Sequence, residues 1–375
     1  MSDNPVMKLQ DFGQSIWLDF LRRQLIESGE LQGLIDNDGV RGVTSNPSIF
    51  EKAIAGSGDY DDAIRELAEE GHGADEIYER LAVEDIQAGT DLFRRMWDES
   101  DGHHGFVSLE VNPHLARDTS GTIEEARRLW RDVDRPNVLI KVPATKEGLP
   151  AIQQLIAEGI NINVTLLFGL PRYREVAEAY IAGIEERVSR GESVYRITSV
   201  ASFFLSRIDV LVDSMLEVKA QGEGREAEIA NKLYGQVAIA SAKIAYQMYK
   251  DIFGTSRWRK LADRGARVQR LLWASTSTKN PEFRDVKYVE ALIGPETINT
   301  VPMDTLEAWR DHGEPRETLE EGLDDAAEIL DLLPEVGVDI DNVTAQLVDE
   351  GIEKFNDPFD DLMDTLSEAV EDVKA

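Results

Sequence analysis

A lysine lies inside an apolar run that is typical of a buried strand. Residues 138–142 read Val-Leu-Ile-Lys-Val, and Pro143 follows directly. A run this short, stopped by a proline, predicts a strand rather than a helix. Burying an ammonium without a partner is costly, and favouring the neutral amine lowers that cost, depresses the lysine pKa and leaves a nucleophile. Lys141 is therefore a candidate for Schiff-base chemistry on a carbonyl substrate, although a lysine at a strand end can also extend its charge to solvent.

Polar side chains also stand at the ends of other strand-like runs. Taken singly, each has a structural explanation: Asp19 could cap the next helix, Asn46 could belong to a turn that starts a helix, and Glu110 could pair with a surface arginine. Together, a lysine, two carboxylates, two amides and several hydroxyls favour a common site. The members of this set besides Lys141 are Asp19, Thr44, Asn46, Glu110, Asn163, Thr165, Ser202 and Ser275.

These residue types suit the steps that a lysine nucleophile needs. A carbinolamine must lose water to become an iminium, which requires a proton donor and acceptor near the lysine, and Glu110 and Thr165 could serve through a water molecule. The iminium is an electron sink, so a neighbouring carbon–carbon bond can break once a base takes the adjacent hydroxyl proton. Asp19 is the candidate base. Asparagine amides can hold the remaining hydroxyls without titrating.

Eight strand candidates alternate with helical patterns and must position these residues. Such alternation indicates parallel βαβ units. A closed barrel fits better than an open sheet, because no Gly-x-Gly-x-x-Gly turn follows the first strand and polar residues follow many strands rather than one switch point. We therefore expect an α/β fold, a (β/α)8 TIM barrel, with its site where the strands end. The predicted strands are 15–19, 39–44, 106–111, 138–142, 159–167, 195–201, 270–274 and 298–301.

Helical patterns outside this alternation predict two additions to a single domain over residues 1–375. Residues 51–100 hold three such patterns after the second strand, which is long for one connection and indicates a helical insert. Acidic helices are expected over 315–375, and the last has an apolar stripe that should dock on the body. Further helices are predicted after the third strand, starting at Thr122, and over 148–158, 171–190 and 226–253. The stripe consists of Phe355, Phe359, Leu362, Leu366 and Val370.

Composition excludes several functional classes. The chain has 72 acidic and 40 basic residues, a net charge of −32, which repels nucleic acid and anionic membranes, so neither is an expected partner. It has no cysteine and its five histidines lack metal-ligand spacing, so no metal site is expected; His103-His104 is interpreted as a solvated loop. No apolar stretch approaches the ~20 residues of a membrane span, and residues 1–10 lack a secretory pattern. We expect a cytoplasmic protein.

Four motifs resemble the transaldolase family. They are Gly-Val-Thr-Ser-Asn-Pro-Ser at 42–48, Val-Leu-Ile-Lys at 138–141, Gly-Ile-Asn-Ile-Asn-Val-Thr-Leu-Leu-Phe at 159–168 and Ser-Phe-Phe-Leu-Ser-Arg-Ile-Asp at 202–209. By motif placement the likeness covers roughly the first 310 residues. The insert at 51–100 and the acidic tail are expected to lie outside a minimal family pattern, which leaves the oligomeric state open between monomer and homodimer.

The resemblance implies an activity and roles for the site residues. It implies transfer of a dihydroxyacetone unit, without a cofactor, in the non-oxidative pentose phosphate pathway. The donor would be sedoheptulose 7-phosphate or fructose 6-phosphate, and the acceptor glyceraldehyde 3-phosphate or erythrose 4-phosphate. By this resemblance Lys141 would be the Schiff-base lysine, and Asp19 would be the acid that handles the hydroxyl proton. Glu110 and Thr165 would hold the catalytic water, and Arg207 would bind phosphate. The contacts of the dihydroxyacetone moiety would be Asn46, Asn163 and Ser202, with Thr44 beside them.

One position departs from the family pattern. The family's second phosphate arginine follows the seventh strand, where this chain reads Ala-Ser-Thr-Ser-Thr-Lys-Asn-Pro over 274–281. Lys279 is the best match, so a point charge would replace a two-pronged guanidinium. Ser275 could be the contact instead.

Phe204 bears on two rival functions. Related fructose 6-phosphate aldolases are similar to this family but carry a tyrosine there, whose hydroxyl would help to release free dihydroxyacetone. A phenylalanine cannot do this, so the three-carbon unit should wait on Lys141 for an aldehyde. A class I aldolase is the alternative reading, and a non-catalytic barrel that binds sugar phosphates, with acidic helices serving a partner, is the third.

Overall fold

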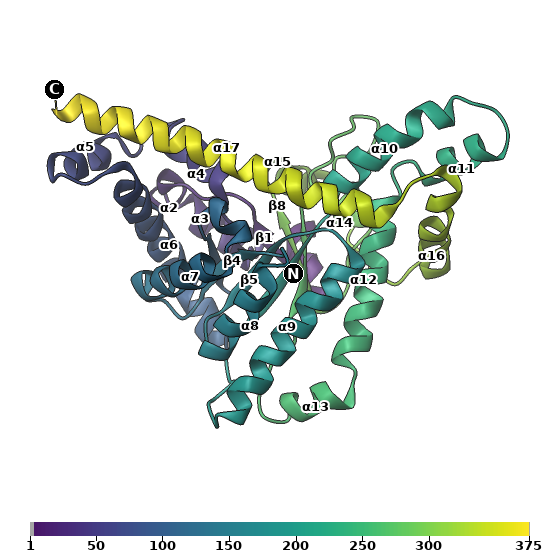
Figure 1. The fold of residues 1–375 in the computed structure, drawn as a ribbon, viewed down its shortest axis with the longest axis horizontal. Coiled ribbons are helices and arrows are strands. Elements are labelled where there is room, and N and C mark those ends of the chain that lie inside the picture. Colours follow the sequence, from purple (N-terminus) through teal and green to yellow (C-terminus); the bar gives the residue numbers. More distant parts are fainter. Residues whose placement is uncertain (1–3, 375) are drawn as a thin grey trace.

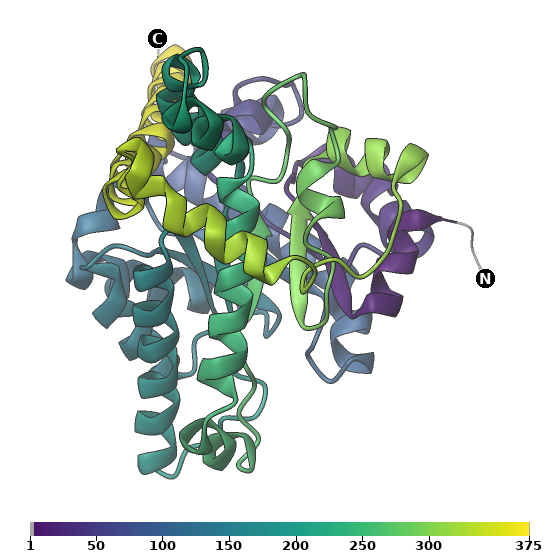
Figure 2. The ribbon, with the colours of Figure 1, turned by 90° about the vertical axis from the view of Figure 1, so that its right-hand side faces the viewer.

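A closed barrel of eight parallel strands forms the centre of the computed structural model, which describes residues 4–374 (Figures 1 and 2). The strands follow one another around the barrel in chain order, and β8 pairs with β1 to close it. The predicted (β/α)8 architecture is therefore confirmed. The strands are β1 (Gln14–Leu18), β2 (Gly42–Val43), β3 (Phe106–Glu110), β4 (Val138–Pro143), β5 (Ile162–Leu167), β6 (Ser199–Phe204), β7 (Arg270–Ala274) and β8 (Thr297–Val301).

β2 and β6 differ most from their predicted extents, for local reasons. β5 starts at Ile162 rather than at 159, and β1, β3, β4 and β8 shift by one residue at one or both ends. β6 starts at Ser199 rather than at 195, because Arg196 has a φ of 65°, which is incompatible with an extended strand. Ser202 consequently lies within β6. β2 is only two residues long, and a Cβ at Gly42 would lie 2.5 Å from the Trp17 ring, so glycine permits this close approach.

Helices surround the barrel and connect successive strands. One predicted helix, 148–158, has the observed bounds, whereas the region 226–253 divides into two helices at Gly235, whose φ is 66°. The helix after β3 begins at Thr119 rather than at Thr122, because the Asp118 side chain accepts a hydrogen bond from Gly121 N and caps it. The helices up to the end of β8 are α1 (Pro5–Lys8), α2 (Arg23–Glu27), α3 (Glu30–Asp38), α4 (Pro47–Ile54), α5 (Asp61–Glu69), α6 (Ala74–Glu99), α7 (Thr119–Val133), α8 (Gly148–Glu158), α9 (Leu170–Ser189), α10 (Ser206–Ala220), α11 (Arg225–Leu233), α12 (Val237–Phe253), α13 (Ser256–Ala262) and α14 (Lys287–Glu290).

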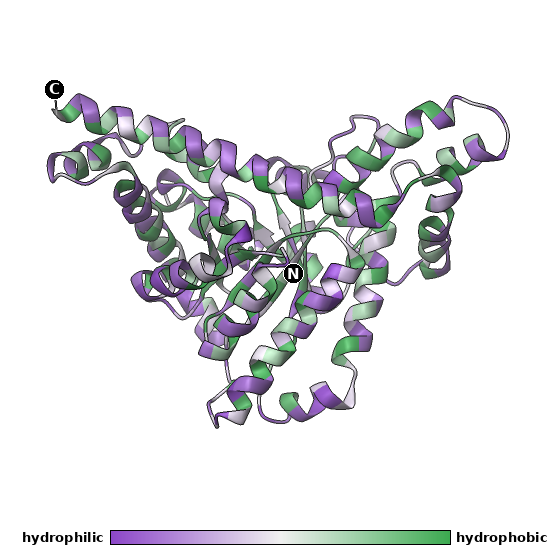
Figure 3. Ribbon diagram, viewed as in Figure 1, coloured by the Kyte–Doolittle hydropathy of each residue, from purple (hydrophilic) through white to green (hydrophobic). Residues whose placement is uncertain are grey.

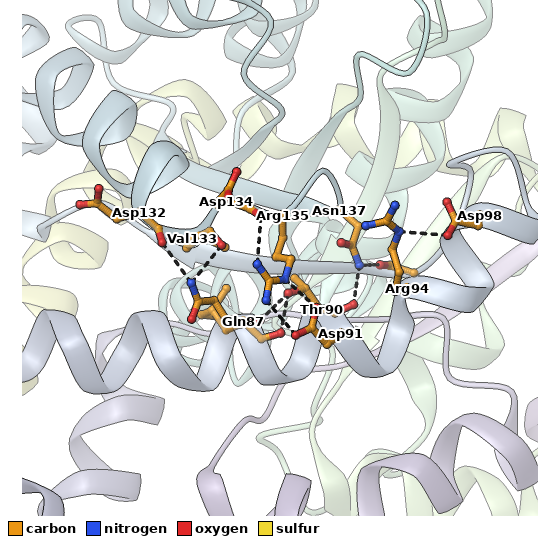
Figure 4. Close-up of polar contacts among 12 residues, drawn as sticks. Gln87, Thr90, Asp91, Arg94, Asp98, Asp132, Val133, Asp134, Arg135 and Asn137 are labelled. Carbon is orange, nitrogen blue, oxygen red and sulfur yellow. Dashed lines mark hydrogen bonds and ion pairs between the residues drawn. The ribbon is translucent and has the colours of Figure 1, made fainter.

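The helical insert is present as α4, α5 and α6, and α6 holds the start of the lysine-bearing strand. Asn137, directly before β4, donates hydrogen bonds of 2.8 Å to the carbonyls of Thr90 and Gly105 (Asn137 and Thr90 are labelled in Figure 4). Gln87 of α6 donates to the carbonyls at the end of α7, and Arg135 pairs with Asp91 at 2.6 Å. α6 therefore fixes where β4 enters the barrel.

A 35-residue helix, α17 (Ile340–Lys374), follows α15 (Met303–His312) and α16 (Leu323–Leu332). Figure 1 shows it running from the side of α11 and α16 towards α5, and it contacts α4, α5, α6, α10 and β5. Hydrophobic and hydrophilic residues alternate along it in Figure 3. All five residues of its predicted apolar stripe are buried, so the expected docking is confirmed. Treating residues 1–375 as one domain stays a prediction.

The interpretation of His103-His104 as a solvated loop is wrong for His104. Its ring nitrogens lie 3.3 Å from Ser15 Oγ and 2.9 Å from Arg41 Nη1. Burial, reinforced by the positive charge of Arg41, lowers the pKa of His104 to about 3, so the ring is neutral. Within residues 4–374, none of the helices is both long enough and apolar enough to cross a bilayer.

Candidate active site

A cavity of about 260 Å³ opens at the carboxyl ends of the strands, where a barrel of this kind places its active site. All the predicted site residues except Glu110 and Asn163 line it. The lining residues are Asp19, Thr44, Asn46, Lys141, Thr165, Ser202, Phe204, Arg207, Ala274, Ser275, Thr276, Ser277, Lys279, Thr300, Pro302 and Phe355.

Lys141 is buried at the floor of this cavity, with only 4% of its surface exposed. Its Nζ lies 2.7 Å from Glu110 Oε2 and donates a 2.8 Å hydrogen bond to the carbonyl of Ser45. The register of β3 and β4 pairs Glu110 with Lys141, which explains why the carboxyl and the amine meet. The side chain therefore points into the barrel and does not extend to bulk solvent.

Glu110 and Thr165 come from the two strands that flank β4. Burial raises the pKa of Glu110 above its ordinary value, and the charge of Lys141 opposes that shift. In the part of the chain that the structure describes, Glu110 Oε1 and Thr165 Oγ1 are buried without a hydrogen-bond partner. Buried polar atoms of this kind are usually satisfied by ordered water, so these two oxygens on either side of the lysine strand suit a shared water molecule.

Asp19 follows β1 and lines the same cavity as Lys141. Its Oδ1 accepts a 2.6 Å hydrogen bond from Thr44 Oγ1, which in turn lies 2.7 Å from Thr300 Oγ1. Burial raises the pKa of Asp19, and the Thr44 hydrogen bond and the charge of Lys141 oppose the shift. The carboxyl group is thus oriented by a hydroxyl pair and can take up a proton more readily than an exposed aspartate.

The amide residues divide between the cavity and the barrel interior. Asn46 caps α4 by accepting a 3.0 Å hydrogen bond from Ile49 N, and it also lines the cavity. Asn163 is fully buried below the cavity, where it accepts from Ser202 Oγ at 2.6 Å and donates to Ser108 Oγ at 3.1 Å. Ser202 reaches the cavity, so it connects Asn163 to the site.

Two cationic side chains form the other end of the cavity. Arg207 lies in the first turn of α10 with its guanidinium carbon 5.5 Å from the Phe204 ring centre, and its buried Nη1 has no hydrogen-bond partner among residues 4–374. Lys279 Nζ donates to Ser277 Oγ at 2.6 Å. Burial and the charge of Arg207 lower the pKa of Lys279, as expected for neighbouring cations with no anion between them. Ser275 Oγ is 2.8 Å from Ser206 Oγ, and this end suits a phosphate group.

The backbone is strained at two positions beside these residues. Leu166, next to Thr165, has a φ of 53°, and Ser275 has a φ of 54°. Non-glycine residues in this region cost roughly 1–3 kcal/mol and persist where surrounding structure holds them. At Leu166 the holding element is α17, because a Cβ on Gly351 would lie 2.9 Å from the Leu166 side chain.

Sequence reasoning missed several cavity residues. Thr300 is the last residue but one of the eighth strand and could have been found by the rule that identified the other strand ends. Phe355 had been assigned only to the docking stripe, but its ring centre lies 5.8 Å from both Lys141 Nζ and the Arg207 guanidinium carbon. No pattern in the sequence distinguishes it from its neighbours in the stripe. The described part of the chain holds no cluster of histidine, aspartate or glutamate side chains placed to bind a metal ion.

Comparison with known proteins adds to this geometry. A family model described as transaldolase/fructose-6-phosphate aldolase matches residues 16–366. The chain is 47% identical over 374 residues to a transaldolase of Trichodesmium erythraeum, an alignment that covers 99% of this chain and 98% of the relative. It is 48% identical over 351 residues to a transaldolase of Thiobacillus denitrificans (94% and 96% covered) and 44% identical over 367 residues to that of Saccharopolyspora erythraea (98% and 98%).

These matches correct one expectation. The likeness was predicted to end near residue 310 and to exclude the insert and the acidic tail. The family match instead runs through 51–100 and onward to residue 366, so it includes most of α17. This extent agrees with the part that Phe355 and Gly351 of α17 take in the site.

Proposed function

The chain belongs to the transaldolase/fructose-6-phosphate aldolase family, and from that membership we propose that it moves a dihydroxyacetone unit between phosphorylated sugars. Its activity is that of a transaldolase. The proposed donors are sedoheptulose 7-phosphate and fructose 6-phosphate, and the proposed acceptors are glyceraldehyde 3-phosphate and erythrose 4-phosphate. The observation that best supports this proposal is that the Lys141 amine is buried in the cavity, 2.7 Å from the Glu110 carboxyl.

Lys141 opens the proposed reaction by attacking the keto carbon of the donor. The resulting carbinolamine loses its hydroxyl as water, and Glu110 supplies the proton through a water molecule held with Thr165. The raised pKa of Glu110 supports this role, because a carboxyl that keeps its proton to a higher pH is a better general acid near neutrality. The product is an iminium on Lys141.

Asp19 performs the second step by removing the proton of the hydroxyl next to the bond that breaks. The electron pair of the carbon–carbon bond moves into the iminium, and the first aldose phosphate leaves. The three-carbon unit stays on Lys141 as an enamine, and an acceptor aldehyde reverses the sequence. Phe204 carries no hydroxyl that could protonate this enamine, which supports transfer over release of free dihydroxyacetone.

Arg207 and Lys279 are proposed to bind the phosphate at the far end of the sugar. Both line the cavity, and the buried Nη1 of Arg207 has no acceptor among the residues that the structure describes. Asn46 and Ser202 are proposed to hold the hydroxyls of the dihydroxyacetone unit. Asn163 is proposed to act through Ser202, whose hydroxyl it fixes. An assembly as monomer or homodimer and a cytoplasmic location stay predictions.

Borohydride trapping tests this proposal. Incubation with fructose 6-phosphate and borohydride should leave a dihydroxyacetone adduct on the peptide that contains Lys141, as read by peptide mass mapping, and Lys141→Met should leave none. Without an aldehyde acceptor, free dihydroxyacetone should not accumulate. Folded protein that binds the sugar but forms no adduct would contradict the Schiff-base mechanism, and steady release of dihydroxyacetone would instead favour the aldolase alternative.

A further inference from the structure

A second cavity, of about 400 Å³, lies beside the barrel, between α6, α7, the segment after β3 and α17. We call it the side cavity. It is separate in its lining from the substrate cavity, since the two share no residue. Its lining includes Tyr78, Ala82, Glu110, Glu125, Arg128 and Phe359.

Glu110 connects the two cavities. It lines the side cavity and not the substrate cavity, yet its Oε2 lies 2.7 Å from the Nζ of Lys141, which lines the substrate cavity. Its Oε1 is buried and has no hydrogen-bond partner within residues 4–374. Glu110 therefore contacts the reacting amine and also borders a second space, whose lining residues differ from those of the substrate cavity.

The reaction requires exchange at this position. Converting a neutral amine and a ketone into an iminium consumes one proton and releases one water molecule, and hydrolysis at the end takes up one water and returns the proton. We expect a sugar phosphate bound in the 260 Å³ substrate cavity to fill the space next to Lys141. A second route to Glu110 would let the water molecule and the proton pass while the sugar phosphate is bound.

The walls of the side cavity suit water. Glu125 accepts from Asn112 N at 3.3 Å and lies 3.4 Å from Arg128, which also pairs with Glu79. Burial raises the pKa values of both Glu125 and Tyr78. The charged or titratable groups that face the space are Asp75, Tyr78 and Glu79 from α6, Glu125 and Arg128 from α7, and Glu110 from β3.

This lining satisfies the requirement for ordered water. A water molecule in a protein needs two to four polar partners and room of its own, and the side cavity, with its volume of about 400 Å³ and polar lining residues that include Glu110 and Glu125, offers both. The exposed Asp75 side chain marks the end that meets solvent. Ala82 is the smallest side chain of the lining, and Phe359, stacked edge-on against Tyr78 with ring centres 5.4 Å apart, bounds the cavity on the α17 side.

We propose that the side cavity is a water channel through which Glu110 exchanges water and protons with solvent while a sugar phosphate occupies the substrate cavity, with Glu125 as the proton-relaying residue of its wall. In the forward step the protonated Glu110 carboxyl gives its proton, through the water molecule held with Thr165, to the carbinolamine hydroxyl, and the C–O bond breaks. The nitrogen lone pair forms the C=N bond, and water leaves into the channel. The carboxylate regains a proton from solvent by way of Glu125 and the channel water. This inference rests on the proposed Schiff-base role of Glu110.

Oxygen-18 exchange measures the channel directly. Fructose 6-phosphate labelled at its keto oxygen is incubated with the enzyme, and loss of label to solvent is compared with the number of Schiff-base events counted by borohydride quenching. In the wild-type enzyme each event should release the label. In Ala82→Leu, which fills the channel, the released water should be returned to the same sugar, so label loss per event should fall roughly fivefold or more, since a plugged path has no room for water. Ala82→Ser, which leaves the space open, is the matched control.

Glu125→Gln tests the relay and does not depend on whether Ala82→Leu folds. The amide keeps the acceptor for Asn112 N but carries no exchangeable acid proton. The rate of Schiff-base formation should fall roughly tenfold with KM unchanged and with a larger solvent deuterium isotope effect, because proton return becomes limiting. Equal label loss per event in Ala82→Leu and wild type, or an unchanged rate and isotope effect in Glu125→Gln, overturns the channel. Absence of any adduct in the wild-type enzyme would instead overturn the proposed function.

Discussion

Replacing Glu110 by glutamine separates acid–base catalysis from substrate binding. Glu110→Gln keeps the shape of the side chain. In the wild-type structure Lys141 Nζ lies 2.7 Å from Glu110 Oε2, and the amide oxygen of the variant can still accept a hydrogen bond from it. The variant loses the titrating proton. General acid–base catalysis contributes about 10²–10⁴-fold, or about 3–5 kcal/mol of barrier, so the rate of Schiff-base formation should fall within that range. Sugar affinity should change by less than about threefold, because Glu110 does not line the substrate cavity and lost contacts are what weaken binding.

The assay measures both quantities on the same protein. Rapid mixing with fructose 6-phosphate, quenching with borohydride at set times and mass analysis of the Lys141 peptide give the rate of adduct formation. The dependence of that rate on sugar concentration gives the affinity. Thr44→Ser, which keeps the hydroxyl bonded to Asp19, is a control in the same cavity that should leave both quantities near wild type. If Glu110→Gln slowed adduct formation and weakened binding by the same factor, Glu110 would act in binding and the reasoning would be refuted.

Three further outcomes follow from the same geometry. Asp19→Asn should form the Schiff base but fail to cleave it, so trapping should yield an adduct of the whole six-carbon sugar phosphate; a three-carbon adduct at the wild-type rate would exclude Asp19 as the base. Arg207→Ala should raise KM for fructose 6-phosphate roughly 10–100-fold, since a hydrogen bond to a charged group contributes about 1.5–3 kcal/mol, and Lys279→Ala should have a smaller effect; an unchanged KM in steady-state assays would remove Arg207 from phosphate binding. The pKa of Asp19 is raised in the folded protein, so the protonated carboxyl stabilises the fold. This stabilisation is fully present below the unfolded-state pKa of about 3.9 and is lost as the pH rises through the higher folded-state pKa. The melting temperature of Asp19→Asn relative to wild type should therefore be higher at about pH 8 than at about pH 4, and the opposite trend in a thermal scan would show that the carboxylate is stabilised in the fold.

Much of the barrel and of its polar strand ends was predictable because both depend on short-range pattern. Lys141 interrupts an apolar run, so its place in a strand was predictable from neighbouring residues, whereas its burial was favoured over extension to solvent only by the other polar strand ends. Asp19 and Thr165 were found by the same reasoning, and both line the cavity. In a barrel of parallel strands, every carboxyl end meets at one face, so a local pattern is enough to bring distant residues together.

The remaining features depend on backbone conformation or on packing between distant segments. The start of β6 is set by the left-handed conformation of Arg196, and a non-glycine residue at such a position gives no sequence signal. Asn46 was given two competing interpretations, a helix cap and a substrate contact, yet the structure has it capping α4 while lining the cavity. The depth of Asn163 follows from its hydrogen bonds to Ser202 and Ser108, which no spacing rule predicts.

α17 shows most clearly why the site is larger than the strand ends. Three positions on this helix, spaced about one turn apart, contact different parts of the site. Gly351 packs on the strained Leu166, Phe355 lines the substrate cavity, and Phe359 lines the side cavity. A one-turn spacing places residues on a single helix face, so Gly351 lies on the same face as Phe355 and Phe359, which belong to the apolar stripe that docks the helix. The same face that holds α17 on the barrel therefore also shapes the surroundings of Lys141 and Glu110. Because docking and cavity lining share these residues, loss of α17 should remove the site's geometry together with the buried apolar surface, rather than only lowering the stability of an intact barrel.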